Sequence, residues 1–154
     1  MSAAHFPGRF ETSGALVSPY LSGDISAWVT EVGGVDPVTI IRADQDFQVH
    51  VHWTLKGLLT EFVCGYWCVS VFLESIGPGK EIRYPEPPLE IKLTPRPGDV
   101  DYAVWVQIPA NTLDIADCST PYKLATTVTY LTELRHPGPM AGFVEGPLLQ
   151  FYIP

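Results

Sequence analysis

Three cysteines are the first residues in this chain whose chemistry could matter: Cys64 and Cys68, in the stretch FVCGYWCVSVFLES, and Cys118. If Cys64 and Cys68 lie in one extended strand, their Cα atoms are roughly 13 Å apart at about 3.3 Å per residue. A disulfide requires about 4.4–6.8 Å, so they can pair only where Gly65 opens a bulge or tight loop. We expect reduced thiols that pack as small apolar side chains. A disulfide that involves Cys118 is the main alternative, and a metal site is the third.

His50 and His52 form the second candidate, within the segment FQVHVHWTL. Residues two apart in a strand share a face, so these imidazoles could supply half of a zinc site if other segments added ligands. The HxH spacing resembles the two-histidine metal motif of cupin barrels. The sequence departs from that motif, because Ala43 stands where the upstream glycine is expected and the next acid, Glu61, is too far along. We expect an outward polar face here, with metal binding as the alternative.

Catalytic motifs give little support for an enzyme. The sequence has no GxSxG elbow, HExxH pair or phosphate-binding glycine loop. Acidic residues recur near expected strand ends, where they would either cap turns or, if several loops met, bind calcium. These residues are Asp44, Asp46, Asp99, Asp101, Asp114 and Asp117. We therefore assign no catalytic residue and no cofactor, and we favour a protein that is not an enzyme.

The elements that must position these residues are strands. From Phe47 to Leu55, apolar and polar residues alternate with the period of two that marks a half-buried strand. The pattern returns at 67–73, 89–93, 102–108 and 122–130, and more weakly at 25–32, 38–41 and 148–153, which makes about eight strands. Segments 56–62 and 111–117 could each form one helical turn. Prolines on both sides of 89–93 place that strand at a sheet edge.

Short antiparallel strands with one buried face each need a second sheet to cover that face. The pattern predicts an all-β, two-sheet antiparallel sandwich of about 7–9 strands, immunoglobulin-like or, alternatively, a jelly roll. Residues 1–22 are expected to form a flexible arm, and 23–154 a single domain.

Charge and composition narrow the class of partner. The formal charge of −8 argues against nucleic acid, which requires clustered Lys and Arg. No apolar run is long enough for membrane insertion. The N-terminus lacks the pattern of a secretory signal, and the cysteine count is odd. We expect a cytoplasmic location on these grounds.

Several aromatic residues fall on the outward face of their expected strands. Trp105 alternates against Tyr102, Val104 and Val106, and Phe72 and Trp28 are opposed to their apolar neighbours in the same way. Outward aromatics that gather into a patch suggest binding, unless the N-terminal arm or a loop covers them.

These observations favour a binding or assembly module that contacts a protein partner or a second copy of itself. The contact surface would be an aromatic-bearing sheet face or the proline-rich edge strand. Binding-surface candidates are Trp105, Phe72, Trp28 and Tyr66. The alternative is a small-ligand, carbohydrate or metal-dependent protein centred on His50 and His52.

Overall fold

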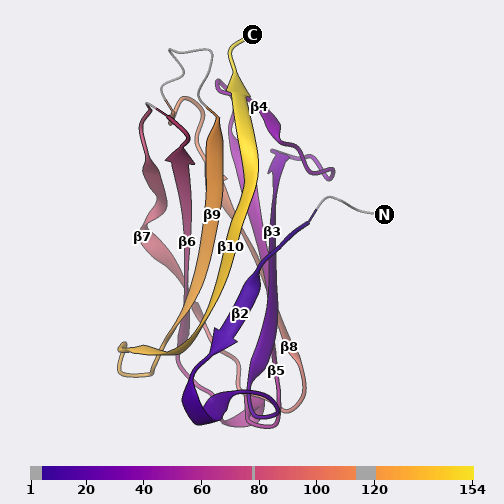
Figure 1. Ribbon diagram of the computed structural model, residues 1–154, viewed down its shortest axis with the longest axis vertical. Coiled ribbons are helices and arrows are strands. Elements are labelled where there is room, and N and C mark those ends of the chain that lie inside the picture. The colour runs from indigo at the N-terminus through magenta and orange to yellow at the C-terminus, as the bar shows by residue number, and fades with distance from the viewer. Residues whose placement is uncertain (1–4, 78, 114–120) are drawn as a thin grey trace.

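The computed structural model describes residues 5–77, 79–113 and 121–154. Strands take 60% of these residues and helix 4%, so the chain is nearly all β, as the alternation predicts. The elements in chain order are β1 Phe6–Pro7, β2 Arg9–Thr12, η1 Gly14–Leu16, β3 Ser22–Glu31, β4 Ile40–Arg42, β5 Phe47–Lys56, η2 Thr60–Phe62, β6 Tyr66–Ser75, β7 Ile82–Lys92, β8 Val100–Ile108, β9 Tyr122–Leu131 and β10 Pro137–Tyr152. Figure 1 shows them along one long axis.

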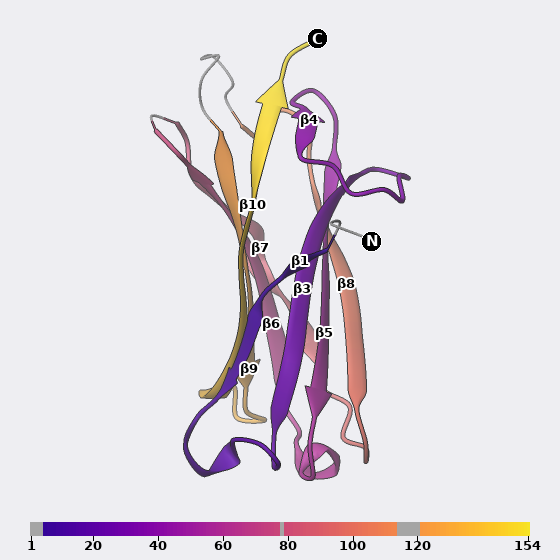
Figure 2. The same cartoon turned by 45° about the vertical axis from the view of Figure 1, so that its right-hand side comes forward.

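The strands form two sheets packed face to face (Figure 2). The four-stranded sheet has the order β1-β3-β5-β8, and the six-stranded sheet has the order β2-β10-β9-β6-β7 with β4 added in parallel to the end of β10. All other pairings are antiparallel. The predicted two-sheet sandwich is confirmed, and its assignment to the immunoglobulin-like or jelly-roll class stays a prediction.

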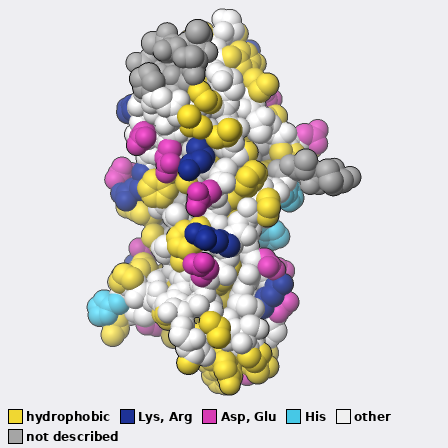
Figure 3. Space-filling view, in the orientation of Figure 1, with side chains coloured by type: hydrophobic (Ala, Val, Ile, Leu, Met, Phe, Trp, Pro, Cys, Tyr) yellow, Lys and Arg dark blue, Asp and Glu magenta, His cyan; other side chains and the backbone are white. Residues whose placement is uncertain are grey.

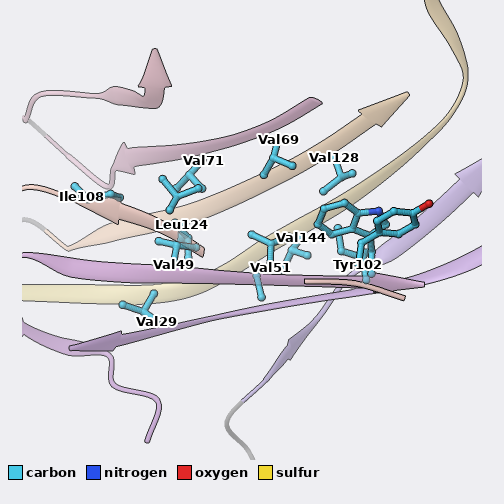
Figure 4. Close-up of a cluster of buried hydrophobic side chains, with 14 of the residues drawn as sticks. Val29, Val49, Val51, Val69, Val71, Tyr102, Ile108, Leu124, Val128 and Val144 are labelled. Carbon is cyan, nitrogen blue, oxygen red and sulfur yellow. The ribbon is translucent and has the colours of Figure 1, made fainter. Parts of the chain in front are cut away.

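The core lies between the sheets, where the inward residues of each alternating strand meet. β5 follows the period of two closely, since Val49, Val51 and Leu55 are buried with at most 1% exposed surface. Figure 4 shows Val49 and Val51 from one sheet opposite Val69, Val71 and other residues of the second sheet. Burial of these apolar side chains is the main force that holds the sheets together.

Each of the eight segments that the sequence predicts as strands overlaps a strand, although the bounds differ; the segment 38–41 overlaps β4 at its last two residues. The last one, predicted at 148–153, belongs to β10, which starts at Pro137. Its early part contains prolines and glycines, so local propensity gave no strand signal. Segment 56–62 contains the short helical turn η2. Segment 111–117 extends beyond the described residues.

The first residues of the chain take part in both sheets. β1 pairs with β3, and β2 pairs with β10. The Gly8 amide donates to the carbonyl of Ile25 at 2.9 Å and extends the pairing with β3, and from Arg9 on the segment pairs with the other sheet. The described part of the segment that the sequence analysis assigned to an arm thus supplies two strands.

The proline-rich strand lies at an edge, as predicted. β7 is the last strand of the six-stranded sheet, and Pro85, Pro87 and Pro88 lie within it. A register shift interrupts its pairing with β6 between Val69 and Val71. The prolines remove amide donors from this edge.

Candidate functional site

Three aromatic side chains form a row across the outer face of the four-stranded sheet. Trp28 of β3 pairs with His50 of β5, and His50 pairs with Trp105 of β8. Residues directly opposite in antiparallel strands bring their Cβ atoms within about 4.5–5.5 Å. The strand register therefore places two of the predicted surface tryptophans, Trp28 and Trp105, on either side of His50, one of the predicted histidines.

At the β3 end of this row, the rings of His5, Trp28 and His50 form a stack. The His5 and Trp28 rings are 3.6 Å apart between centroids and nearly parallel at 12°. On β5, the His50 ring is parallel to Trp28 at 5.4 Å and 4°. His50 Nε2 also lies 2.8 Å from the Thr30 hydroxyl, a hydrogen bond between neighbouring strands. Burial lowers the pKa of His50, and the charge of His5 lowers it further. These contacts hold the His50 ring in place, and the lowered pKa favours its neutral form.

At the β8 end of the row, the Trp105 side chain is exposed to solvent. Trp105 has 60% of its surface exposed, whereas Trp28 is half-buried by its ring neighbours. Trp105 lies on β8, the edge strand of its sheet. A tryptophan so exposed keeps a large apolar area in contact with water.

Among the residues that the structure describes, none in the middle of this face carries a formal charge. The rows on either side of the aromatic row hold Ser26, His52 and Ala103, and Thr30, Gln48 and Gln107. Charged residues stand only in the next rows or at the strand ends: Asp24, Lys56, Asp101 and Asp46. The result is a neutral platform with charged ends.

The outer face of the six-stranded sheet has the opposite character. Lys123 lies 3.7 Å from Glu74 and 3.8 Å from Glu145, and Arg135 pairs with Glu90. Figure 3, with β9 and β10 in front, shows acidic and basic side chains next to one another. Such mixed charge is typical of a solvated surface.

Phe72 and Tyr66 belong to that charged face and not to the row of Trp105. Both lie on β6, where Phe72 pairs with Ala125 and Tyr66 pairs with Lys92. The Tyr66 ring is covered by cations: Arg135 is 4.4 Å and Lys92 5.2 Å from its centroid. The four predicted aromatics therefore divide between two faces on opposite sides of the sandwich.

His50 and His52 share a face as predicted, but they do not converge with other ligands. Within the described residues, no group of three or more His, Cys, Asp or Glu side chains is placed to hold a metal ion. His50 is committed to Thr30 and Trp28, and His52 is exposed.

Cys64 and Cys68 are both free. Cys64 is exposed in the loop before β6, and Cys68 is half-buried in the strand. Gly65 between them has a φ of 129°, a conformation that favours glycine. Cys118 lies outside the described residues, so its pairing stays a prediction.

The acidic residues act mainly as local hydrogen-bond acceptors. Asp46 accepts from the Ala110 amide at 2.7 Å and from the Gln107 side chain at 2.9 Å. Asp101 accepts from the Thr54 hydroxyl at 2.6 Å. Asp44 pairs with Arg42, which lowers the pKa of the Asp44 carboxyl. Asp114 and Asp117 lie outside the described residues.

A shallow hollow of about 790 Å³ lies over β2 and β10. Phe10, Met140 and Phe143 contribute to its lining, and Glu11 is the one ionisable side chain among the described residues that line it. A carboxylate without a second titratable group offers no acid–base pair for catalysis.

Sequence reasoning missed an apolar end of the sandwich. Val17 and Tyr20 in the β2–β3 loop and Leu58 and Phe62 in the β5–β6 loop are 46–71% exposed. The Leu58 amide donates to the Pro19 carbonyl at 3.0 Å, which joins the two loops. No strand alternation applies in loops, so only the tertiary contact reveals this grouping.

No helix in the described residues is long and apolar enough to cross a membrane. Neither the protein-family models nor the curated proteins compared with the sequence gave a match.

Proposed function

We propose that this protein is a non-enzymatic binding or assembly module that contacts another protein through the outer face of its four-stranded sheet. The observation that carries the proposal is the 60% exposure of Trp105 on a platform free of formal charge. Tryptophan is enriched among the residues that dominate protein interfaces, because it removes a large apolar area from water in one step.

The surroundings of Trp105 suit this role. Neutral Ser, Thr and Gln side chains cost less to desolvate than charged ones, so a partner can cover the platform without leaving a buried charge. Asp24 and Asp101 at one end would form a polar rim. His50 and Trp28 are already fixed by their stacking, so little side-chain entropy is lost when a partner covers them.

A carbohydrate ligand is the second candidate, because an exposed indole beside amide and hydroxyl groups can also stack on a sugar ring. The stacking of Trp28 between two imidazoles works against it. Those ring faces already contact each other, which leaves the Trp105 ring as the open aromatic surface of the row. Binding of neutral oligosaccharides, followed by tryptophan fluorescence, would favour this candidate over the protein interface.

The Trp105→Ser variant tests the proposed function. If Trp105 serves an interface, the substitution should weaken association and leave the melting temperature within about 2 °C of wild type, because exposed residues make few core contacts. Assembly mass by light scattering and melting temperature should be measured on the same samples. Phe62→Ser is a matched control, since Phe62 is similarly exposed, at 71%, but lies in the β5–β6 loop.

The opposite pattern would contradict the proposal. If Trp105 instead supports the fold, Trp105→Ser should lower the melting temperature by several degrees without any change in assembly. A monomeric wild type together with a strongly destabilised variant would exclude the interface.

A further inference from the structure

We propose that the partner is a second copy of the chain, joined edge to edge through β8, the strand that carries Trp105. This inference rests on the proposed function and specifies its partner. Two copies of β8 would pair antiparallel about a twofold axis, so that two four-stranded sheets form one continuous sheet of eight strands. Trp105 of each copy would lie beside the joint.

The outer edge of β8 is open. Within the described residues, β8 pairs only with β5, and no backbone hydrogen bond outside that ladder involves residues 100–108. Every edge strand exposes a row of amide and carbonyl groups that can template another strand. β8 is nine residues long, above the average length of a strand.

β8 also lacks three of the features that protect edges: proline, lysine and a bulge. Its sequence, VDYAVWVQI, contains no proline, glycine or lysine, and its pairing with β5 runs from Val100 to Ile108 without a register shift. β7 at the corresponding edge of the other sheet carries three prolines and a register shift. One edge is therefore blocked against strand addition, and the other is not.

The strand is complementary to itself. If Val104 lies on the twofold axis, all nine residues pair, and Pro109 falls just outside the ladder. Asp101, the single charged residue of β8, then faces the neutral amide of Gln107 in the second copy. The bulky Trp105 faces the small Ala103. No like charges are opposed, a condition that antiparallel pairs require.

This register also covers the exposed apolar surface at the edge. Val104, now half-buried, would meet its own counterpart on the axis. The two copies of Trp105 would be diagonal neighbours, about 7–8 Å apart between backbones and within reach of aromatic side chains. Pairing would thus cover the side of each Trp105 indole that faces the joint.

Charge variants of Gln107 test the register. Gln107→Asp would place a second carboxylate opposite Asp101 at both symmetry-related positions of the β8–β8 pair. This repulsion should weaken dimerisation about tenfold or more. Gln107→Lys would place a cation there and should strengthen dimerisation several-fold at low ionic strength, with the gain lost at high salt. Dissociation constants would come from sedimentation equilibrium over a wide concentration range.

Gln48 provides the control. It pairs with Gln107 one strand further from the edge, on the same face. Gln48→Asp and Gln48→Lys therefore make the same change in net charge near Asp46, but they cannot oppose a residue of the second copy. Both should leave the dissociation constant within about twofold of wild type.

Two results would overturn the inference: a wild type that stays monomeric at millimolar concentration, or a dimer that responds equally to the Gln107 and Gln48 variants. The proposed function can fail separately. If the wild type is monomeric and Trp105→Ser keeps the wild-type melting temperature, only the second-copy partner is excluded. If Trp105→Ser is strongly destabilised and assembly is unchanged, the platform itself is excluded.

Discussion

The imidazole of His50 lies parallel to the indole of Trp28, with ring centroids 5.4 Å apart and planes 4° apart. The two rings belong to neighbouring strands, and their contact follows from the register that places Trp28 opposite His50. With His5 on the other side of Trp28, the contact links the first described residue to the sheet. It also gives the platform a titratable group whose pKa is lowered by burial and by the charge of His5.

The lowered pKa of His50 predicts how stability depends on pH. Burial, then the charge of His5, lowers this pKa below its ordinary 6.5. The unfolded chain therefore binds a proton more tightly than the folded one. His50 has no effect well above pH 6.5, where it is neutral in both states, but it lowers the free energy of unfolding as the pH falls below 6.5. Melting temperatures measured from pH 8 to 5 should show this loss.

His50→Gln should flatten that part of the pH profile, because glutamine keeps a polar group near Thr30 but does not titrate. His52→Gln is the control, since His52 lies on the same strand but is exposed. An unchanged pH slope in His50→Gln would show that another group is responsible.

Gly65 is predicted to be intolerant of a side chain. Its φ is 129°, and an added Cβ would collide with the carbonyl oxygen of Leu131. Gly77 has a similar φ of 124° but nothing within 4 Å of an added Cβ. Gly77→Ala should cost about 1–3 kcal/mol from backbone strain alone. Gly65→Ala should cost clearly more, as measured by denaturant unfolding. Equal costs would mean that the backbone near Leu131 yields freely.

Because the indole N–H of Trp53 is buried without a partner among the described residues, we expect Trp53→Ala and Trp53→Phe to lower stability by different amounts. Trp53 is 1% exposed, and its N–H has no hydrogen-bond partner within the described residues. Trp53→Ala should destabilise by about 3–5 kcal/mol through the cavity it leaves. Trp53→Phe should cost less than half of that, because phenylalanine fills part of the space and removes the unpaired donor. Chemical denaturation of both variants would measure this. A Phe variant as unstable as the Ala variant would argue that the N–H is in fact paired.

The two free cysteines should differ in reactivity. Cys64 is exposed and Cys68 is half-buried on the outer face of β6, so an alkylating reagent should modify Cys64 first. Mass mapping of a non-reduced digest should find no bridge between them. Detection of a Cys64–Cys68 bridge would require the chain around Gly65 to close more tightly than it does here.

The sequence by itself determined the strands and the face of each side chain, because alternation is a local property of extended backbone. Phe47–Leu55 is almost the whole of β5, and the outward direction of Trp105 follows from its neighbours alone. The edge position of the proline-rich strand could also be predicted from local sequence. Proline has no amide hydrogen to donate, so a strand rich in proline is restricted to a sheet edge.

Only the tertiary structure decided which outward residues meet. Trp105 and Phe72 share a pattern in the sequence, but β8 and β6 belong to different sheets, so the two side chains lie on opposite faces. Trp28 points outward like Trp105, yet His5 of the N-terminal segment stacks on it, and Trp105 stays open. The order of the strands, and which side chains are covered by other segments, depend on contacts between residues distant in the chain. The period-two alternation of a strand carries no information about these contacts. Side-chain direction was therefore encoded locally, and accessibility arose only when the sheets assembled.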